Sequence, residues 1–178
     1  MDIQQLQSQL SQASGDKQYP PVDKWDPEYC GEMPLVIKRN GQWWHQGTPF
    51  TRAKLVALFS SVLKKEEDRY FLVTPVEKIG IQVEDVPFVA IDADTSDTGI
   101  QISTQVGDKV LISEQHPVEL RTFEDAQVPY VNVRRNLWAR VHQNVLYRWV
   151  DQAEHVSNGN KTELFLTSNG YRFSIGEF

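Results

Sequence analysis

Apolar and polar residues alternate along much of the chain, and this period of two predicts a series of short β-strands. The Asn40-Gly41 pair lies between two of these segments and suits a type I′ turn, which predicts a β-hairpin there. Other turns are expected at Gly107-Asp108 and at Ser168-Asn169-Gly170. The predicted strands cover about residues 35–39, 42–46, 69–74, 77–84, 88–91, 100–106, 110–112, 118–123, 130–133, 162–167 and 171–176.

Three other segments place apolar residues at the helical period of 3.6. A weakly amphipathic helix is predicted over residues 2–13, and a second helix over about 51–64. The third predicted helix, about 134–156, rests on apolar residues at intervals of four. Those residues are Leu137, Val141, Val145, Trp149 and Ala153.

The two halves of the chain resemble each other, which suggests an internal repeat. Arg52-x-x-Leu55 opens the second predicted helix and Arg134-x-x-Leu137 opens the third, although chance matches between apolar positions are the alternative. We therefore expect an α+β fold of two similar small units, each an antiparallel sheet packed by one helix in the order hairpin, helix, hairpin, after a short N-terminal helix. The expected divisions are a helix and linker over 1–18, an N-terminal unit over 19–95 and a C-terminal unit over 96–178.

Composition and charge narrow the class of protein. The 178 residues carry a formal net charge of −6 with a pI of about 5.2, which argues against broad affinity for nucleic acid or anionic membrane. One cysteine, Cys30, excludes an intramolecular disulfide. The N-terminal residues do not resemble a signal peptide and the apolar runs are too short to span a bilayer. We therefore expect a cytoplasmic protein with neither nucleic acid nor membrane as a partner.

Motifs with known chemistry are missing from the sequence, so we expect no metal and no cofactor. The four histidines are scattered without zinc-ligand spacing. Asp92-Ala-Asp94-Thr-Ser96 only partly matches an aspartate-based phosphatase motif or a calcium loop, and an acidic turn after a strand is the simpler interpretation.

Four longer motifs carry a family resemblance from residue 22 to the C-terminus. They are Arg39-Asn-Gly-x-Trp43-x-His45-x-Gly47-x-Pro49, Arg52-x-x-Leu55-Val-x-Leu-Phe59, Leu72-Val-Thr-Pro-Val-Glu-Lys78 and Ile81-x-Val-Glu-Asp-x-Pro-Phe88. In the second half, Arg134-Arg-Asn-Leu-Trp-Ala-Arg140 and Asn169-Gly170 also fit. On these motifs the chain resembles the bacterial family catalogued as domain of unknown function 1285. The resemblance implies an α+β fold with repeated motifs, and it implies no established activity, cofactor or catalytic residue.

The most promising surface lies in the first half. An exposed tryptophan face beside an arginine can stack on a ring or a cation, and a dense charge group can form the rim of a cleft. The alternatives are a tryptophan in the core and a cross-strand ion pair at the surface. The candidate ligand-binding residues are Arg39, Trp43, His45, Arg52, Glu77, Lys78 and Glu84.

A secondary anion site is suggested where the third predicted helix begins. Arg134, Arg135 and Arg140 would place cationic side chains near a helix N-terminus, where a phosphate or carboxylate can bind. The alternative is that these arginines pair with acidic residues of the same chain.

Three hypotheses for function follow. The leading one is a non-enzymatic binding or regulatory module, possibly in signalling, that recognises a protein or a small anionic ligand in a cleft between its two units. The second is an enzyme of unrecognised type with Glu77 or His45 as acid or base. The third is a structural subunit of a homo-oligomer.

Overall fold

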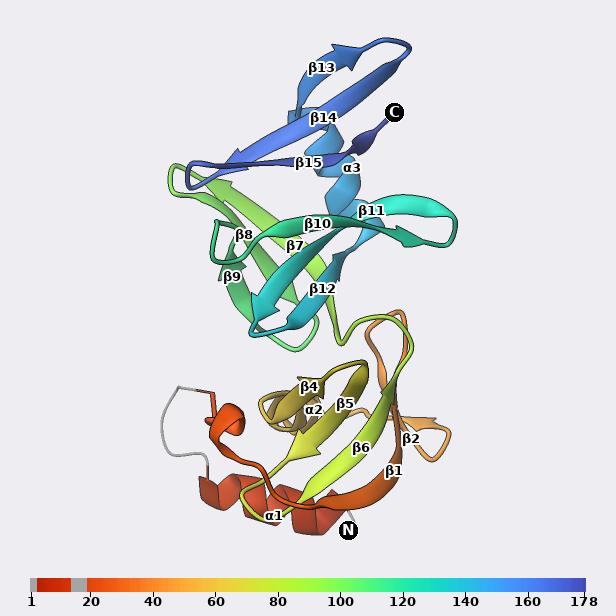
Figure 1. Ribbon diagram of the computed structural model, residues 1–178, viewed down its shortest axis with the longest axis vertical. Helices are drawn as coiled ribbons and strands as arrows, with labels where there is room; N and C mark the ends of the chain where they lie inside the picture. Colours follow the sequence, from red (N-terminus) through yellow and green to blue (C-terminus); the bar gives the residue numbers. More distant parts are fainter. Residues whose placement is uncertain (1–2, 14–18) are drawn as a thin grey trace. The chain divides into compact units, whose positions relative to one another are not determined.

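The computed structural model describes residues 3–13 and 19–178, which form two compact units divided between Asp85 and Val86 (Figure 1). The division comes earlier than the expected one at residues 95 and 96. Strand β7 (Phe88–Ser96) runs through the expected boundary, because the acidic segment predicted as a turn continues this strand and pairs with β8 (Gly99–Thr104). Most of the linker expected before residue 19 lies outside the described residues.

The N-terminal unit contains one six-stranded sheet in the order β3-β2-β1-β6-β5-β4. Neighbouring strands are antiparallel except β1 and β6, which are parallel. The sheet is therefore mixed, and the expectation of a purely antiparallel sheet is wrong. The strands are β1 (Tyr29–Ile37), β2 (Trp43–His45), β3 (Thr48–Pro49), β4 (Leu63–Glu66), β5 (Arg69–Val73) and β6 (Lys78–Val83).

The predicted hairpin at Asn40-Gly41 joins β1 and β2, but its turn differs from the predicted type. The Lys38 N–H donates to the Gln42 carbonyl at 2.8 Å, and the Gly41 N–H donates to the Lys38 carbonyl at 2.9 Å. Gly41 has a φ of 88°, whereas Asn40 does not have a positive φ. This is a type I turn followed by a left-handed glycine, because the loop is one residue longer than a type I′ turn permits.

Two helices of this unit pack against each other and contribute to its core. Helix α2 (Ala53–Ser60) buries Leu55 and Phe59, and it contacts α1 (Ile3–Ala13), which buries Leu6 and Leu10. Helix α2 is shorter than the predicted 51–64, because the residues from Leu63 onward pair with β5 as strand β4. A short 3₁₀ helix (Val22–Lys24) precedes β1.

The C-terminal unit has two sheets. The first has the order β10-β11-β12-β7-β8-β9, in which β12 and β7 are parallel; the second is the antiparallel meander β13-β14-β15. Helix α3 (Gln143–Gln152) contacts β7 of the first sheet and β14 and β15 of the second (Figure 1). The remaining strands are β9 (Lys109–Leu111), β10 (Val118–Phe123), β11 (Ala126–Arg134), β12 (Leu137–Val141), β13 (Glu154–Asn158), β14 (Lys161–Ser168) and β15 (Tyr171–Glu177).

The prediction of one helix over 134–156 is wrong. Arg134 ends β11, Arg135 adopts a φ of 51° in the turn that follows, and β12 returns before α3 begins. Leu137 and Val141 are buried as strand residues, whereas Val145 and Trp149 are buried on α3. A period of four is also even, so the same apolar positions satisfy a strand and then a helix.

The two units are similar in one respect that the sequence suggested. In each, a helix is followed by a three-stranded antiparallel meander, β4-β5-β6 after α2 and β13-β14-β15 after α3. The expected match of Arg52 to Arg134 is wrong, since Arg52 directly precedes α2 and Arg134 lies in a strand. The hairpin–helix–hairpin order also fails in the C-terminal unit, where six strands precede α3.

None of the helices in the described part of the chain is long and apolar enough to cross a bilayer.

Candidate functional site

One side of the N-terminal sheet carries charged side chains where the other carries the core. Residues directly opposite each other in a sheet share a face. The pairs Glu66 with Arg69, Phe71 with Gly80, and Glu32 with Gly80 therefore lie on one side of the sheet. We call this side the polar face and define it by Tyr29, Glu32, Glu66, Arg69, Phe71 and Lys78.

Glycine at position 80 makes room for the Glu32 carboxylate. A Cβ atom at Gly80 would lie 2.4 Å from both carboxylate oxygens of Glu32, so any larger residue would displace this side chain. In its present position Glu32 Oε1 accepts from Arg69 Nη2 at 2.5 Å and from the Tyr29 hydroxyl at 2.6 Å. The sheet thus brings together an acid from β1 and a base from β5, 37 residues apart in sequence.

Aromatic rings complete the environment of Arg69. Its Cζ atom lies 5.1 Å from the ring centroids of both Tyr29 and Phe71. The two rings meet edge to face, with centroids 6.1 Å apart and planes at 83°. Hydrogen bonds to the Tyr29 hydroxyl and to Glu32 raise the pKa of Arg69 above its usual value, so its guanidinium is charged at all physiological pH.

A second group of charges lies beside the first. Lys78 Nζ pairs with Glu66 Oε2 and lies 4.5 Å from the Phe71 ring centroid. Lys64 Nζ lies 3.3 Å from Glu66 Oε1 and donates to the Trp25 carbonyl at 3.1 Å. The hydrogen bond from Lys78, together with Lys64, lowers the pKa of Glu66 below its ordinary value of 4.5.

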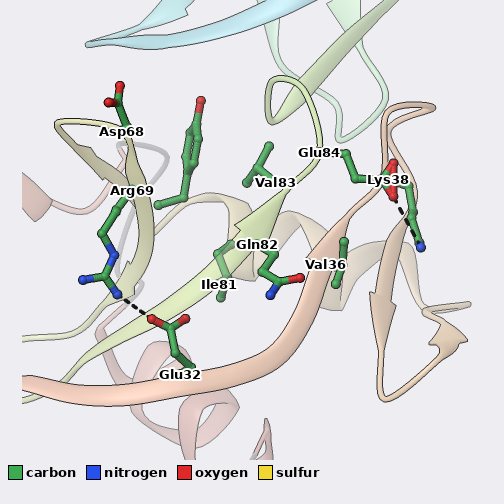
Figure 2. Close-up of a pocket in the computed structure, with 10 residues that line it drawn as sticks. Glu32, Val36, Lys38, Asp68, Arg69, Ile81, Gln82, Val83 and Glu84 are labelled. Atoms are coloured by element: carbon green, nitrogen blue, oxygen red, sulfur yellow. Dashed lines mark hydrogen bonds and ion pairs between the residues drawn. The ribbon is translucent and has the colours of Figure 1, made fainter.

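Two surface hollows border these groups and share Arg69 as a wall. The larger hollow, about 600 Å³, includes Glu32, Asp68, Arg69 and Glu84 in its lining. The smaller, about 350 Å³, includes Tyr29, Glu66, Glu67, Phe71 and Lys78. In Figure 2, Arg69 and Glu32, which both line the larger hollow, point toward each other and are in contact, and the Asp68 carboxylate points away from this pair.

Of the seven predicted binding residues, Arg39 and Glu84 are in contact, and Glu84 lines the larger hollow. Glu84 Oε2 accepts the backbone N–H of Arg39 at 3.2 Å and lies 3.5 Å from Arg39 Nε. Lys38 Nζ lies 3.4 Å from Glu84 Oε1 (Figure 2). The Arg39 N–H and these cations lower the pKa of Glu84. Lys78 is the second predicted residue that lines a hollow, the smaller one, whereas Arg39 lines neither.

The other four predicted residues do not line either hollow. Trp43 is 2% exposed and packs in the core, so its ring is not available to a ligand. His45 stacks on Phe50 with ring centroids 6.1 Å apart, and Arg52 is exposed at the start of α2. Glu77 lies in the turn between β5 and β6, where its buried Oε2 has no hydrogen-bond partner among residues 3–13 and 19–178.

The three arginines of the predicted anion site do not form one site at a helix start. Arg134 is buried and its Nη1 lies 2.8 Å from Asp108 Oδ1. Arg135 is exposed in the turn between β11 and β12, and the Arg140 Cζ lies 4.0 Å from the Phe123 ring centroid. This prediction failed because the segment begins with a strand end and a turn instead of a helix.

Tyr29, Glu32 and Arg69 were not predicted from the sequence. They come from two strands that meet only through β6, and no local motif connects them. Within residues 3–13 and 19–178, no three His, Cys, Asp or Glu side chains are grouped closely enough to hold a metal ion.

Comparison with known proteins gives consistent results for both units. Residues 20–86 match the family model described as "Domain of unknown function (DUF1285), N-terminal domain", and residues 87–175 match "Protein of unknown function (DUF1285), C-terminal domain". No curated protein matches the chain significantly.

Two crystal structures are similar to the chain. A DUF1285 family protein from Silicibacter pomeroyi DSS-3 is 39% identical, with a TM-score of 0.84 over 96% of this chain and 93% of the other. A DUF1285 family protein from Shewanella baltica OS155 is 30% identical, with a TM-score of 0.55 over 67% of this chain and 92% of the other.

Proposed function

This chain belongs to the DUF1285 family, and we propose that it is a non-enzymatic binding module whose polar face binds a basic segment of a partner protein. The proposal places the binding surface within the N-terminal unit, at the two hollows that share Arg69.

The distribution of ion pairs on the polar face carries the proposal. Every cation that lines the two hollows already contacts a carboxylate: Lys38 contacts Glu84, Arg69 contacts Glu32 and Lys78 contacts Glu66. By contrast, Glu67 and Asp68, in the turn between β4 and β5, form no ion pair with any described residue. One lines each hollow.

This distribution favours an incoming cation over an incoming anion. A lysine or arginine side chain can pair with Glu67 or Asp68 without breaking an existing contact. A small anion would have to displace a carboxylate of the protein from its cation. Of the two partner classes expected from the sequence, a protein is therefore better supported than a small anionic ligand.

Binding through exposed charges is weak and reversible, which suits a regulatory role. An exposed ion pair contributes about 0–1 kcal/mol, so several contacts are needed for even micromolar affinity. Screening by salt weakens such contacts, since the Debye length falls to about 8 Å at physiological ionic strength.

The alternative of an enzyme has less support. The described lining of the two hollows contains no serine, cysteine or histidine that could act as a nucleophile or as a base at neutral pH. His45 and Glu77 lie outside both linings.

The third alternative, a homo-oligomer subunit, is tested by light scattering of the chain with and without residues 1–18.

The test compares two variants with equal charge changes. Titration calorimetry with an unlabelled arginine-rich peptide should detect binding to the wild type. The Glu67→Gln/Asp68→Asn variant should bind this peptide about tenfold more weakly, as the loss of two exposed ion pairs implies. The control, Asp97→Asn/Glu114→Gln, changes two exposed acidic residues of the C-terminal unit and should bind as the wild type does. Equal weakening in both variants, or no binding at all, contradicts the proposal.

A further inference from the structure

We infer that Tyr29, Phe71 and Glu32 form a recognition site for one guanidinium or ammonium group, and that Arg69 of the same chain occupies this site in the free protein. The identity of the natural ligand, a basic side chain of a partner protein, rests on the proposed function. The existence of the site rests on geometry alone.

Three features that recognise a cation converge on the Arg69 guanidinium. The first is a pair of aromatic faces, since its Cζ lies 5.1 Å from the centroids of both Tyr29 and Phe71, within the range of a cation–π contact. The second is the Glu32 carboxylate at 2.5 Å, and the third is the Tyr29 hydroxyl at 3.3 Å. The Tyr29 hydroxyl donates to Glu32 Oε1 at 2.6 Å and so holds the carboxylate in position.

The occupant reaches solvent, whereas one ring of the site, Phe71, is held in the core. The Arg69 side chain is 57% exposed, whereas Phe71 is 3% exposed. Lys78 also contacts the Phe71 ring, but its side chain is only 15% exposed and pairs with Glu66. Lys78 is therefore held in place beside the site and is not the exchangeable cation. Arg69 can therefore leave through solvent, while the ring that it covers stays in place.

The neighbouring turn supplies a route for exchange. Glu67 and Asp68 directly precede Arg69 in the chain, and each lines one of the hollows that Arg69 separates. A basic side chain attracted to these carboxylates would arrive next to the Arg69 site. There it could replace Arg69 against the two rings and Glu32, so Arg69 acts as a competitor that limits the affinity for a partner.

Competition by a resident side chain lowers apparent affinity in proportion to its occupancy. When a site is free for a fraction f of the time, the apparent dissociation constant rises by a factor of 1/f. If Arg69 occupies the site for about nine-tenths of the time, its removal should raise the affinity for a free cation about tenfold.

The experiment measures binding of methylguanidinium to the full chain by NMR, following the amide shifts of residues around Gly80. Arg69→Ala should bind it about tenfold more tightly than the wild type. Arg172→Ala is the matched control, because Arg172 also lies over a ring, Phe165 at 3.8 Å, and pairs with Glu154 at 3.3 Å. It removes the same charge, and its affinity at the Gly80 region should equal that of the wild type.

A second variant tests the site itself. Adding Tyr29→Leu to Arg69→Ala should abolish the gain, since one of the two rings and the hydroxyl are lost. The inference is overturned if Arg69→Ala and Arg172→Ala bind equally, or if the Tyr29→Leu double variant keeps the full gain. Either result would show that the change in methylguanidinium affinity comes from the net charge of the protein and not from a specific site at Tyr29, Phe71 and Glu32.

The outcomes also separate this inference from the proposed function. Binding of an arginine-rich peptide that depends on Glu67 and Asp68, with no gain in Arg69→Ala, would contradict the inference and leave the proposed function standing. A gain in methylguanidinium affinity, with no peptide binding to the wild type, would contradict the proposed function and leave the site standing.

Discussion

The same substitution, glycine to alanine, should have opposite consequences at two buried positions of this protein. At Gly80 a methyl group would lie 2.4 Å from the carboxylate oxygens of Glu32. These atoms are the far end of a flexible side chain that is 53% exposed, so Glu32 can turn into solvent. At Gly99 a methyl group would lie 2.5 Å from Ser168 Oγ and 2.9 Å from the backbone nitrogen of Asn169. Neither of those atoms can move freely.

The expected cost at Gly80 is small. Loss of the exposed pair between Arg69 and Glu32 removes about 0–1 kcal/mol, and replacing glycine by alanine restores about 0.4–1 kcal/mol by restricting the unfolded chain. Gly80→Ala should therefore change the free energy of unfolding by less than about 1 kcal/mol. For a protein of this length the melting temperature should shift by less than about 4 °C.

The expected cost at Gly99 is larger for two reasons. Its φ of 139° is strained for alanine, which costs about 1–3 kcal/mol. Ser168 Oγ is also fixed by two hydrogen bonds, accepting from the Ile100 N–H at 2.8 Å and donating to the Ile112 carbonyl at 2.7 Å. Disturbing these buried bonds adds about 1–3 kcal/mol, so Gly99→Ala should cost at least about 2 kcal/mol.

Urea denaturation followed by circular dichroism measures both variants against the wild type. Gly80→Ala should also shift the Arg69 side-chain NMR signals, because Glu32 no longer reaches the guanidinium. The reasoning is refuted if Gly80→Ala destabilises the protein as much as Gly99→Ala does, or if Gly80→Ala leaves the Arg69 signals unchanged.

Three further predictions concern single side chains. Ser168→Ala should cost about 2 kcal/mol in urea denaturation, because it removes both buried hydrogen bonds to Ile100 and Ile112, and a change below about 0.5 kcal/mol would contradict this. Arg134→Ala should cost about 3–5 kcal/mol by leaving Asp108 buried without its cation, and Arg134→Ala/Asp108→Ala should recover part of that loss in the same assay. The folded-state pKa of Glu66 is lowered, so its pairs should stabilise the protein above pH 4.5 and lose this effect as the pH falls through the lowered pKa. Glu66→Gln should show a flatter urea midpoint between about pH 6 and about pH 3, and an unchanged profile would argue against this role.

Local signals in the sequence predicted where two hairpins lie. The alternation around Asn40-Gly41 located a hairpin, and Asn169-Gly170 joins β14 and β15 with φ values of 50° and 75°. The parallel pairs β1 with β6 and β12 with β7 could not be predicted, because they join segments that are distant along the chain. The turn at Arg135 was missed because its left-handed residue is not glycine or asparagine.

The candidate site shows the same limit. Glu84 and Lys78 stood out as a dense charge group, and both line hollows on the polar face. Their neighbours Tyr29, Glu32 and Arg69 look ordinary in sequence, because their contacts depend on the strand order β1-β6-β5. Trp43 looked like a ligand platform, yet a short strand gives no indication of which of two adjacent tryptophans faces the core.

Whether the polar face binds basic segments can be tested directly by an NMR titration of the isotope-labelled full chain with an arginine-rich peptide, compared with the same peptide in which glutamine replaces arginine. Binding at the polar face should give saturable shifts at Glu32, Glu67, Asp68 and Arg69 with the arginine peptide, and none with the glutamine peptide. Shifts confined to the C-terminal unit, or equal shifts with both peptides, would rule out the polar face as a binding surface for basic segments.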